Sequence, residues 1–330
     1  MKKIAIIGAG ISGISLSSML NKTSDVTVFE KSRQPGGRMC TRTKLSFDFD
    51  HGVQFFKIST LEFKNFLNPL FEKGIIKPWV HRYAEIEHNK ILKINHIKSN
   101  DNFFVGVPKM NSITQELAQN CKINLNNRIC YLNRKNDKWE LYNEKKDYCG
   151  NYDWVIFTLP VEQICSIIPK NISFFDKIDL IKMKSCYSLM VGLNNYLDLD
   201  YDTASVKGED ISWIAVNSSK PNRRKGKFTL VINSSYDYAD KNKTVNDEKI
   251  SNHLLNVASK IMERNLSQLS LKVLHKWNYV ESVIHPKEDF FVDLENRIAT
   301  CGDWCTNSRV EGAYLSAMNI YERLSQYILE

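Results

Sequence analysis

Three glycines near the N-terminus have the spacing of a phosphate-binding turn. Gly8, Gly10 and Gly13 directly follow a short apolar run, and a stretch with a helical pattern comes after them. In such a turn the first glycine permits a tight bend, the second lets the backbone approach a pyrophosphate, and the third lets the helix pack closely on the strand. The free N–H groups at the helix start attract phosphates. We therefore expect Ile11 and Ser12, which open the helix, to lie at the same ligand.

A second predicted strand, 26–29, ends on Glu30 and is followed by Lys31. A carboxylate in this position accepts hydrogen bonds from a ribose 2′-hydroxyl, and it would repel a 2′-phosphate. The order of strand, glycine turn, helix, strand and acid is the context that a dinucleotide-binding fingerprint requires, although a glycine turn alone is a weak signal. The sequence thus predicts a dinucleotide cofactor with Glu30 and Lys31 beside it.

A second glycine turn follows six residues beyond Glu30 and consists of Gly36, Gly37, Arg38 and Met39. A domain that binds NAD alone has no need of this turn. It brings an arginine back towards the phosphates, where the planar guanidinium can pair with an anion. We expect Gly37, Arg38 and Met39 to line the cofactor site, and a solvated loop arginine is the alternative.

The residues 30–39 resemble the corresponding string of the flavin amine oxidases and their relatives. The resemblance implies noncovalently bound FAD, with Arg38 near its pyrophosphate. It extends to the segment 47–56, which in this superfamily runs under the flavin, so we expect no metal site at the histidine there. The flavin neighbours that the resemblance implies in this segment are His51, Gly52, Gln54 and Phe55.

Two central segments also resemble parts of the superfamily that return to the cofactor. The predicted strand that contains Ile129 corresponds to backbone that flanks the adenine. The predicted strand 152–160 contains Thr158 and corresponds to the strand that rejoins the cofactor sheet. Ile129 and Thr158 are therefore implied to lie at the FAD.

The C-terminal region resembles the superfamily as well. A predicted strand ends on Gly302 and Asp303, and in the superfamily this aspartate holds the ribityl chain. The final helix opens with Glu311, Gly312 and Ala313, and its N-terminus is implied to point at the pyrimidine end of the flavin. A helix N-terminus there would stabilise the negative charge of the reduced ring.

Within the superfamily the chain is most similar to the renalase-like flavoproteins, which include bacterial members. The similarity runs the length of the chain. The segments that show it are 30–31, 36–41, 51–56, 137–141, 217–221, 276–277 and 302–305. It implies an oxidase that acts on the 2- and 6-dihydro isomers of NAD(P)H, returns NAD(P)+ and reduces O2 to H2O2. Hydride transfer to a flavin needs little acid–base chemistry, and the chain has no obvious nucleophile or triad.

Aromatic residues of the second half are candidates for the substrate face, because they could sandwich a nicotinamide ring. They are Trp277, Tyr279, His275 and Trp213, and core packing is the alternative for each. The basic loop 220–225 is predicted to be either a solvated hairpin tip or a contact for substrate phosphates.

Two other functions remain open from the sequence. An amine oxidase of the same superfamily would need an aromatic cage opposite the flavin and often a lysine near flavin N5, for which Lys184 is the candidate. A flavin-dependent isomerase, or a cofactor-binding module without turnover, would release no peroxide. Peroxide release on addition of substrate separates these classes.

Composition limits the class of protein. The net charge of +8 is spread along the chain without a nucleic-acid recognition motif, so we expect no nucleic acid as a partner. The eight cysteines form no CxxC pair and no zinc-like cluster, which favours reduced thiols, a cytoplasmic location and no metal site. The N-terminal apolar run is predicted to be the first strand rather than a signal peptide, and no apolar run is long enough to span a membrane.

These motifs must be positioned by two domains of an α/β protein. The resemblance implies a Rossmann-like FAD-binding domain and a second α+β substrate domain, the architecture of amine oxidases and of p-hydroxybenzoate hydroxylase. We assign 1–58, 104–162 and 290–330 to the FAD-binding domain, and 59–103 and 163–289 to the substrate domain. Period-two and helical patterns predict strands at 187–193, 211–216, 228–234 and 272–277, and helices within 60–78 and 246–264.

Overall fold

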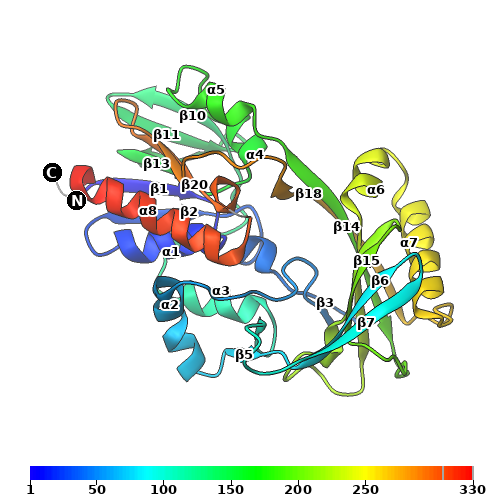
Figure 1. Cartoon of the computed structure of the whole chain (residues 1–330). Coiled ribbons are helices and arrows are strands. Elements are labelled where there is room, and N and C mark those ends of the chain that lie inside the picture. The colour runs from blue at the N-terminus through cyan, green and yellow to red at the C-terminus, as the bar shows by residue number, and fades with distance from the viewer. Residues whose placement is uncertain (307, 329–330) are drawn as a thin grey trace.

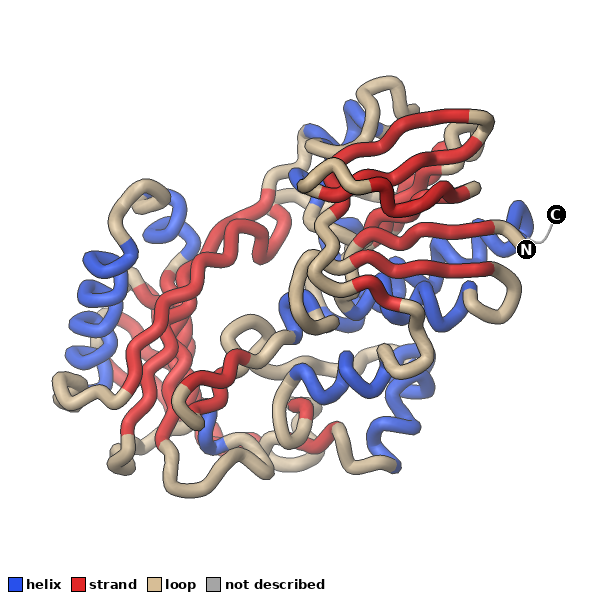
Figure 2. Tube along the Cα trace, turned by 180° about the vertical axis from the view of Figure 1, so that it is seen from behind, coloured by secondary structure: helices blue, strands red, loops and turns tan. Residues whose placement is uncertain are grey.

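Two lobes, joined by a long pair of antiparallel strands, make up the computed structural model of this chain (Figure 1). The structure describes residues 1–306 and 308–328. The connecting strands are β14 (Met183–Leu193) and β18 (Leu271–Ser282). Figure 2 shows the same two strands from behind, crossing from one lobe to the other.

The first lobe is built on a six-stranded sheet with the order β19-β20-β13-β1-β2-β9 in the described chain. All neighbouring strands are parallel except β19, which is antiparallel to β20. The strands are β1 (Lys3–Ile7), β2 (Asp25–Phe29), β9 (Ile123–Asn124), β13 (Trp154–Phe157), β19 (Phe290–Asp293) and β20 (Ile298–Cys301).

Both faces of this sheet are covered, which explains why its strands are apolar almost throughout. On one face Ile4 and Ile6 pack with the helices α1 (Ile11–Leu20) and α8 (Val310–Ile328). On the other face Ala5 and Ile7 pack with a second layer. That layer consists of β10 (Ile129–Lys135), β11 (Lys138–Asn143), β12 (Tyr148–Tyr152), α4 (Val161–Cys165) and α5 (Phe175–Asp179).

The second lobe is built on a seven-stranded sheet with the order β18-β14-β17-β16-β15-β6-β7 among the described residues. Besides the two connecting strands it contains β6 (His81–Glu87), β7 (Lys90–Ile97), β15 (Thr203–Lys207), β16 (Ile211–Val216) and β17 (Phe228–Ser234). The helices α6 (Tyr236–Lys241) and α7 (Asp247–Met262) cover its outer face. Its inner face is turned towards the first lobe.

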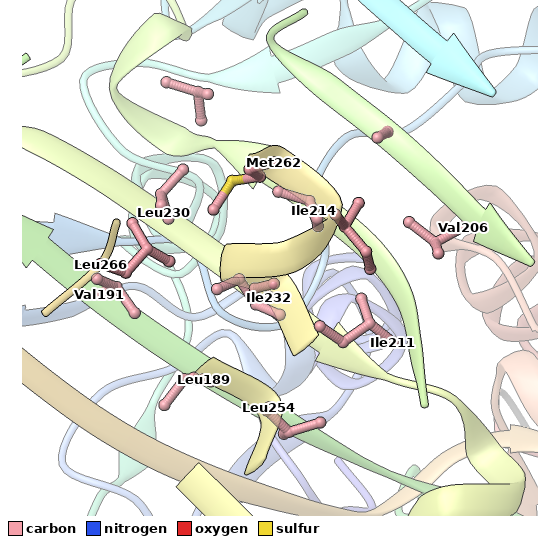
Figure 3. Packing of buried hydrophobic residues seen from close by; sticks show 14 of the residues in the cluster. Leu189, Val191, Val206, Ile211, Ile214, Leu230, Ile232, Leu254, Met262 and Leu266 are labelled. Carbon is pink, nitrogen blue, oxygen red and sulfur yellow. The ribbon is translucent and has the colours of Figure 1, made fainter. Parts of the chain in front are cut away.

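The amphipathic pattern of α7 produces the core of the second lobe. Ile250, Leu254 and Ile261 recur at helical spacing and are buried. They share one hydrophobic cluster with alternate residues of the central strands, such as Leu189 and Ile232. Figure 3 shows Leu254 in this cluster. The opposite face of those strands is therefore free to line a site.

Shorter elements fill the space between the lobes. They are η1 (Gly37–Met39), β3 (Arg42–Lys44), β4 (Phe47–Phe49), α2 (Leu61–Glu72), β5 (Ile76–Pro78), β8 (Phe104–Gly106), α3 (Asn111–Leu117), η2 (Asn217–Ser219) and η3 (Asp303–Cys305). Phe63 and Leu67 of α2 share one hydrophobic cluster with Tyr314 of α8 and Ala215 of β16. The predicted second-lobe helix thus packs against both lobes.

The predicted α/β fold with two lobes is confirmed, whereas the domain boundaries stay predictions. The predicted strands 211–216 and 228–234 agree with β16 and β17, and the helix within 246–264 with α7. The strands predicted at 187–193 and 272–277 are longer, because each continues into the connection between the lobes. Among the described helices, none is both long and apolar enough to cross a lipid bilayer.

Candidate active site

A cavity of about 1070 Å³ lies between the two lobes. Its walls come from the glycine turn, the loop 30–42, the start of α8, and the inner face of β14, β17 and β18. Ligand pockets in proteins typically measure about 300–1,000 Å³, so this cavity can hold a large ligand or two ligands together. The following groups decide which ligands it suits.

The glycine turn forms a cradle for an anion at one end of the cavity. Gly8 has a φ of +114°, which favours glycine, and a Cβ on Gly13 would collide with the carbonyl oxygen of Gly8. A Cβ on Gly10 would meet nothing within 4 Å, so space remains above the turn. The helix α1 begins without a side-chain cap, which leaves its first N–H groups available. These features fit the pyrophosphate of a dinucleotide.

Glu30 is buried at the end of β2 and lines the same part of the cavity. Its Oε2 accepts a hydrogen bond from the Ala9 N–H at 2.9 Å, and its Oε1 accepts one from the Ser32 N–H at 2.8 Å. The carboxylate therefore ties the glycine turn to the loop after β2. Each oxygen keeps a second lone pair, so a ribose hydroxyl can still donate to Glu30.

Arg38 and Asp303 form an ion pair across the cavity wall. Arg38 also donates from Nη1 to the carbonyl oxygen of Val280 at 2.6 Å, so one side chain connects η1, η3 and β18. Gly52 approaches this point closely, because a Cβ there would collide with the Arg38 carbonyl oxygen. The residues predicted for the pyrophosphate and for the ribityl chain thus contact each other and both line the cavity.

Two histidines and a tryptophan meet at the second-lobe end of the cavity. The rings of His51 and His275 are perpendicular with centroids 4.9 Å apart, and Trp277 lies 5.3 Å from His51. The carbonyl oxygen of His51 accepts from Trp277 Nε1 at 2.9 Å and from Ser188 Oγ at 2.8 Å. His275, Trp277 and Tyr279 all line the cavity and alternate along β18, as residues on one face of a strand do.

Both histidines are neutral at pH 7. Burial lowers the pKa of His51 to about 3, and the neighbouring His275 and Arg42 add to the effect. Burial, together with the positive charges of Arg42 and Lys31, lowers the pKa of His275 to about 4. Arg42 and Lys31, whose charges help to lower these pKa values, would also repel a further positive charge at this end of the cavity.

The charges of the cavity lining are predominantly positive. Within the described part of the chain, seven basic residues line it: Lys31, Arg33, Arg38, Arg42, Arg128, Lys276 and Arg309. Two carboxylates line it as well, and both are engaged, since Asp303 pairs with Arg38 and Glu30 accepts two backbone N–H groups. The cavity thus suits anionic ligands.

Most of the predicted cofactor residues line this cavity. Together with Glu30, Arg38 and Asp303 they are Gly8, Gly10, Ile11, Ser12, Lys31, Gly37, Met39, His51, Gly52, Ile129, Thr158 and Ala313. Seven predicted residues do not appear in its walls: Gly13, Gln54, Phe55, Trp213, Gly302, Glu311 and Gly312. Their direct contact with a ligand stays a prediction.

Polar side chains of this second group bind backbone groups of segments next to the cavity. Gln54 donates to the Gly52 carbonyl oxygen at 3.2 Å, and Glu311 accepts from the N–H of Thr60 at the start of α2 at 2.7 Å. Trp213 packs 5.9 Å from Phe55, on the same sheet face as the cavity but beyond its wall.

Arg42, Ser188 and Asn233 are among the cavity residues that were not predicted. Arg42 contributes a charge, and Ser188 and Asn233 form a hydrogen-bonded pair with 2.5 Å between Oγ and Oδ1. Ser188 and Asn233 lie within the mostly apolar strands β14 and β17 and face each other in the sheet. A polar residue inside an apolar strand was the available sequence signal.

Neither predicted role of the basic loop 220–225 describes Lys220 and Arg223. Both side chains are buried, and both contact Oδ2 of Asp50, Lys220 at 3.0 Å and Arg223 at 2.6 Å. Burial alone would raise the pKa of Asp50, but the two cations outweigh it and hold the pKa well below its usual value. A buried carboxylate is stabilised only if cations and hydrogen-bond donors contact it, and the loop 220–225 provides the two cations for Asp50.

Lys184, the candidate amine-oxidase lysine, is not part of the cavity wall. Its Nζ lies 3.6 Å from Glu281 and 5.0 Å from the centre of the Tyr236 ring. The described residues also contain no cluster of three or more His, Cys, Asp or Glu side chains that could hold a metal ion.

Comparisons with known proteins agree with this geometry. Residues 6–70 match the model of an NAD(P)-binding Rossmann-like domain. Renalase from Mus musculus is 22% identical over 353 residues, which cover 99% of this chain and all of the mouse protein.

Solved structures resemble the whole chain. A candidate protoporphyrinogen oxidase from Exiguobacterium has a TM-score of 0.80 at 11% identity, covering 99% of both chains. Putrescine oxidase bound to putrescine has a TM-score of 0.69 at 11% identity, covering 98% of this chain and 99% of that one. The chain is therefore similar to renalase over its whole length, matches an NAD(P)-binding Rossmann-like domain over residues 6–70, and has the fold that putrescine oxidase shows.

Proposed function

We propose that this chain is an FAD-dependent oxidase of the renalase type. Its substrates would be the 2- and 6-dihydro isomers of NAD(P)H. In the overall reaction one dihydronicotinamide, one O2 and one proton give one NAD(P)+ and one H2O2. The observation that carries the proposal is the charge of the cavity, because its basic residues outnumber its carboxylates and both of those carboxylates are already engaged.

The residues around the glycine turn would hold FAD without a covalent bond. The turn at Gly8 and Gly10 and the start of α1 suit the pyrophosphate, and Glu30 suits the adenosine ribose. Arg38 would lie near the pyrophosphate, and its partner Asp303 would lie at the ribityl chain, nearer to the second lobe. Bound FAD would supply the hydride acceptor and the reaction with O2, and the protein would supply binding and orientation.

The second-lobe end of the cavity suits a neutral ring better than an ammonium group. A protonated amine placed beside His275 would meet the positive charge of Arg42, and that charge already helps to lower the pKa of His275. A dihydronicotinamide carries no positive charge, and Trp277 offers an aromatic surface for it. The phosphates of the same substrate would be attracted by the basic lining.

The protonation states at this end also agree with a hydride transfer. Because the pKa of His51 is held at about 3 and that of His275 at about 4, both are weak bases. An oxidation that begins by removing a substrate proton would favour a base with a pKa nearer neutrality. Transfer of a hydride needs no such base.

A peroxide assay tests the proposal. Purified protein should be yellow, and acid precipitation should release the flavin into the supernatant if no covalent bond holds it. Addition of borohydride-generated dihydro-NAD isomers in air should give one H2O2 per NAD+ formed. Primary amines should give none. If amines produce peroxide faster than the dihydro isomers do, the chain is an amine oxidase; if neither does, the assignment as an oxidase is wrong.

A further inference from the structure

We propose that Arg42 binds a phosphate group of the substrate and thereby selects nucleotides over unphosphorylated dihydronicotinamides. This inference rests on the proposed function, since it names the part of the substrate that the second-lobe end of the cavity recognises. Arg42 lies on β3, lines the cavity and is half-buried.

Arg42 has no carboxylate partner within salt-bridge distance among residues 1–306 and 308–328. Other half-buried or buried basic residues between the lobes have partners in the protein. Arg38 pairs with Asp303, and Lys220 and Arg223 contact Asp50. The half-buried Lys276 donates to the Lys243 carbonyl oxygen at 2.8 Å. The guanidinium of Arg42 instead contacts a neutral side chain, His275, with Nη2 3.4 Å from Nδ1. A partly buried guanidinium without a counter-ion indicates that the counter-ion is supplied by a ligand.

The contact with His275 also fixes which donors face the ligand. A guanidinium can only donate, so Nδ1 of His275 must be the acceptor and its proton lies on Nε2. The remaining N–H groups of Arg42 are then free to hold two oxygens of one phosphate in the planar fork geometry. The neutral imidazole can add one more donor from Nε2.

Contacts on both sides fix the β3–β4 hairpin, and the backbone that carries Arg42 is therefore preorganised. Asp48 of β4 accepts from Thr43 Oγ1 at 2.5 Å and lies 2.8 Å from Lys109 Nζ. Phe47 and Phe49 are buried against Met190 and Val231 on the inner face of the second-lobe sheet. A preorganised backbone reduces the entropy that binding costs.

The position of Arg42 separates its ligand from the cofactor pyrophosphate. The turn at Gly37 packs against Gly10, at the glycine cradle of the first lobe. Five residues later Arg42 contacts His275, which belongs to the sheet of the second lobe. The phosphate bound by Arg42 is therefore assigned to the substrate and not to FAD.

The test compares ligands with and without phosphate on the FAD-loaded protein. Binding of ADP-ribose and of adenosine is measured by calorimetry for wild type, Arg42→Met and Arg42→Lys. Lys44→Met, an exposed residue of the same strand, is the matched control. Arg42→Met should weaken ADP-ribose binding about ten- to a hundredfold, which corresponds to the loss of a charge-assisted hydrogen bond. Arg42→Lys should recover part of the affinity, and Lys44→Met should bind as wild type does.

Kinetics provide the second measurement. In Arg42→Met the KM for the 6-dihydro isomer of NAD should rise by a similar factor while kcat changes little. The KM for the corresponding dihydronicotinamide riboside, which has no phosphate, should not change. FAD content should equal that of wild type. Equal losses with and without phosphate, an unchanged affinity for ADP-ribose, or loss of FAD would each overturn the assignment of Arg42.

The two proposals can fail separately. If wild-type protein binds ADP-ribose and Arg42→Met does not, but no dihydronicotinamide reduces the flavin, the anion site stands and the proposed reaction is wrong. If the dihydro isomers are oxidised equally well by wild type and Arg42→Met, the reaction stands and the role of Arg42 is wrong.

Discussion

Asp50 and His51 are neighbours in the chain, yet they lie in opposite kinds of environment. Asp50 is fully buried and receives two cations, a Thr41 hydroxyl at 2.7 Å and the Met110 N–H at 3.0 Å. His51 faces the cavity among uncharged rings, near the unpaired cation Arg42. Adjacent residues of the chain therefore lie in two different regions. Around Asp50 the charged side chains contact one another, whereas the Arg42 guanidinium near His51 has no carboxylate partner in the described part of the chain.

The difference indicates which region binds ligands. In the buried cluster of Asp50, Lys220 and Arg223 both cations contact a carboxylate of the protein itself, so the cluster fixes the loop 38–54 against the second lobe. A cavity with an excess of positive charge attracts an anionic ligand, which offsets that charge. Buried charge alone is therefore a weak indicator of function, and the partners of each charge have to be compared.

Removal of Asp50 should have the largest effect on stability. Asp50→Ala leaves Lys220 and Arg223 buried without a counter-ion, and breaking such a pair costs about 3–5 kcal/mol of unfolding free energy. Urea unfolding followed by circular dichroism measures this loss. Glu288→Ala is the control, because the exposed pair of Glu288 with Lys177 should contribute at most about 1 kcal/mol. Equal midpoints for the two variants would contradict the structural role of Asp50.

Glu30→Ala should lower FAD affinity by an intermediate amount. The variant removes the acceptor proposed for the ribose and the link between Ala9 and the loop after β2. A charge-assisted hydrogen bond contributes about 1.5–3 kcal/mol, so the dissociation constant should rise about ten- to a hundredfold. Titration of apoprotein with FAD, followed by flavin fluorescence, measures it. Glu30→Gln keeps one acceptor oxygen and should lose less; unchanged affinity in both variants would remove Glu30 from the site.

The neutral histidines predict a smaller, pH-dependent effect. Their pKa values fall from 6.5 in the unfolded chain to about 3 for His51 and about 4 for His275 in the folded one. The unfolded state then binds more protons below pH 6.5, so the stabilisation is present above that pH and is lost as pH falls towards 4. Between pH 7 and 5.5 each histidine should account for about 1 kcal/mol.

Unfolding curves at these two pH values test this expectation. His51→Gln and His275→Gln should each reduce the loss of stability on acidification. His253→Gln is a control, because that histidine is exposed beside Asp210. A loss of the same size in wild type and in both cavity variants would show that these histidines are not held neutral.

The sequence was sufficient for features whose parts lie close together in the chain. The glycine turn and Glu30 could be recognised because the cradle is built from about thirty consecutive residues, and local spacing determines its geometry. Strands such as 211–216 and 228–234 could be recognised by their apolar pattern and flanking turns.

Features that depend on distant segments could not be predicted. Ser188 and Asn233 face each other because of the register between β14 and β17, and Arg42 meets His275 across the boundary between the lobes. The run of basic residues after Ser219 has the composition of a solvated turn. Only the tertiary structure shows that Lys220 contacts the distant Asp50. The substrate face was predicted from four residues. His275, Trp277 and Tyr279 line the cavity, whereas Trp213 lies beyond its wall.

Anaerobic flavin reduction tests the central claim most directly, namely that the anion-attracting cavity serves oxidation of a dihydronicotinamide dinucleotide. FAD-loaded protein is mixed without O2 with 2-dihydro-NAD, 6-dihydro-NAD, ordinary 4-dihydro-NADH or putrescine, and the flavin absorbance is followed. The account predicts rapid bleaching by the 2- or 6-dihydro isomer, slow or no bleaching by 4-dihydro-NADH, and none by putrescine. Faster bleaching by putrescine than by either isomer would contradict it.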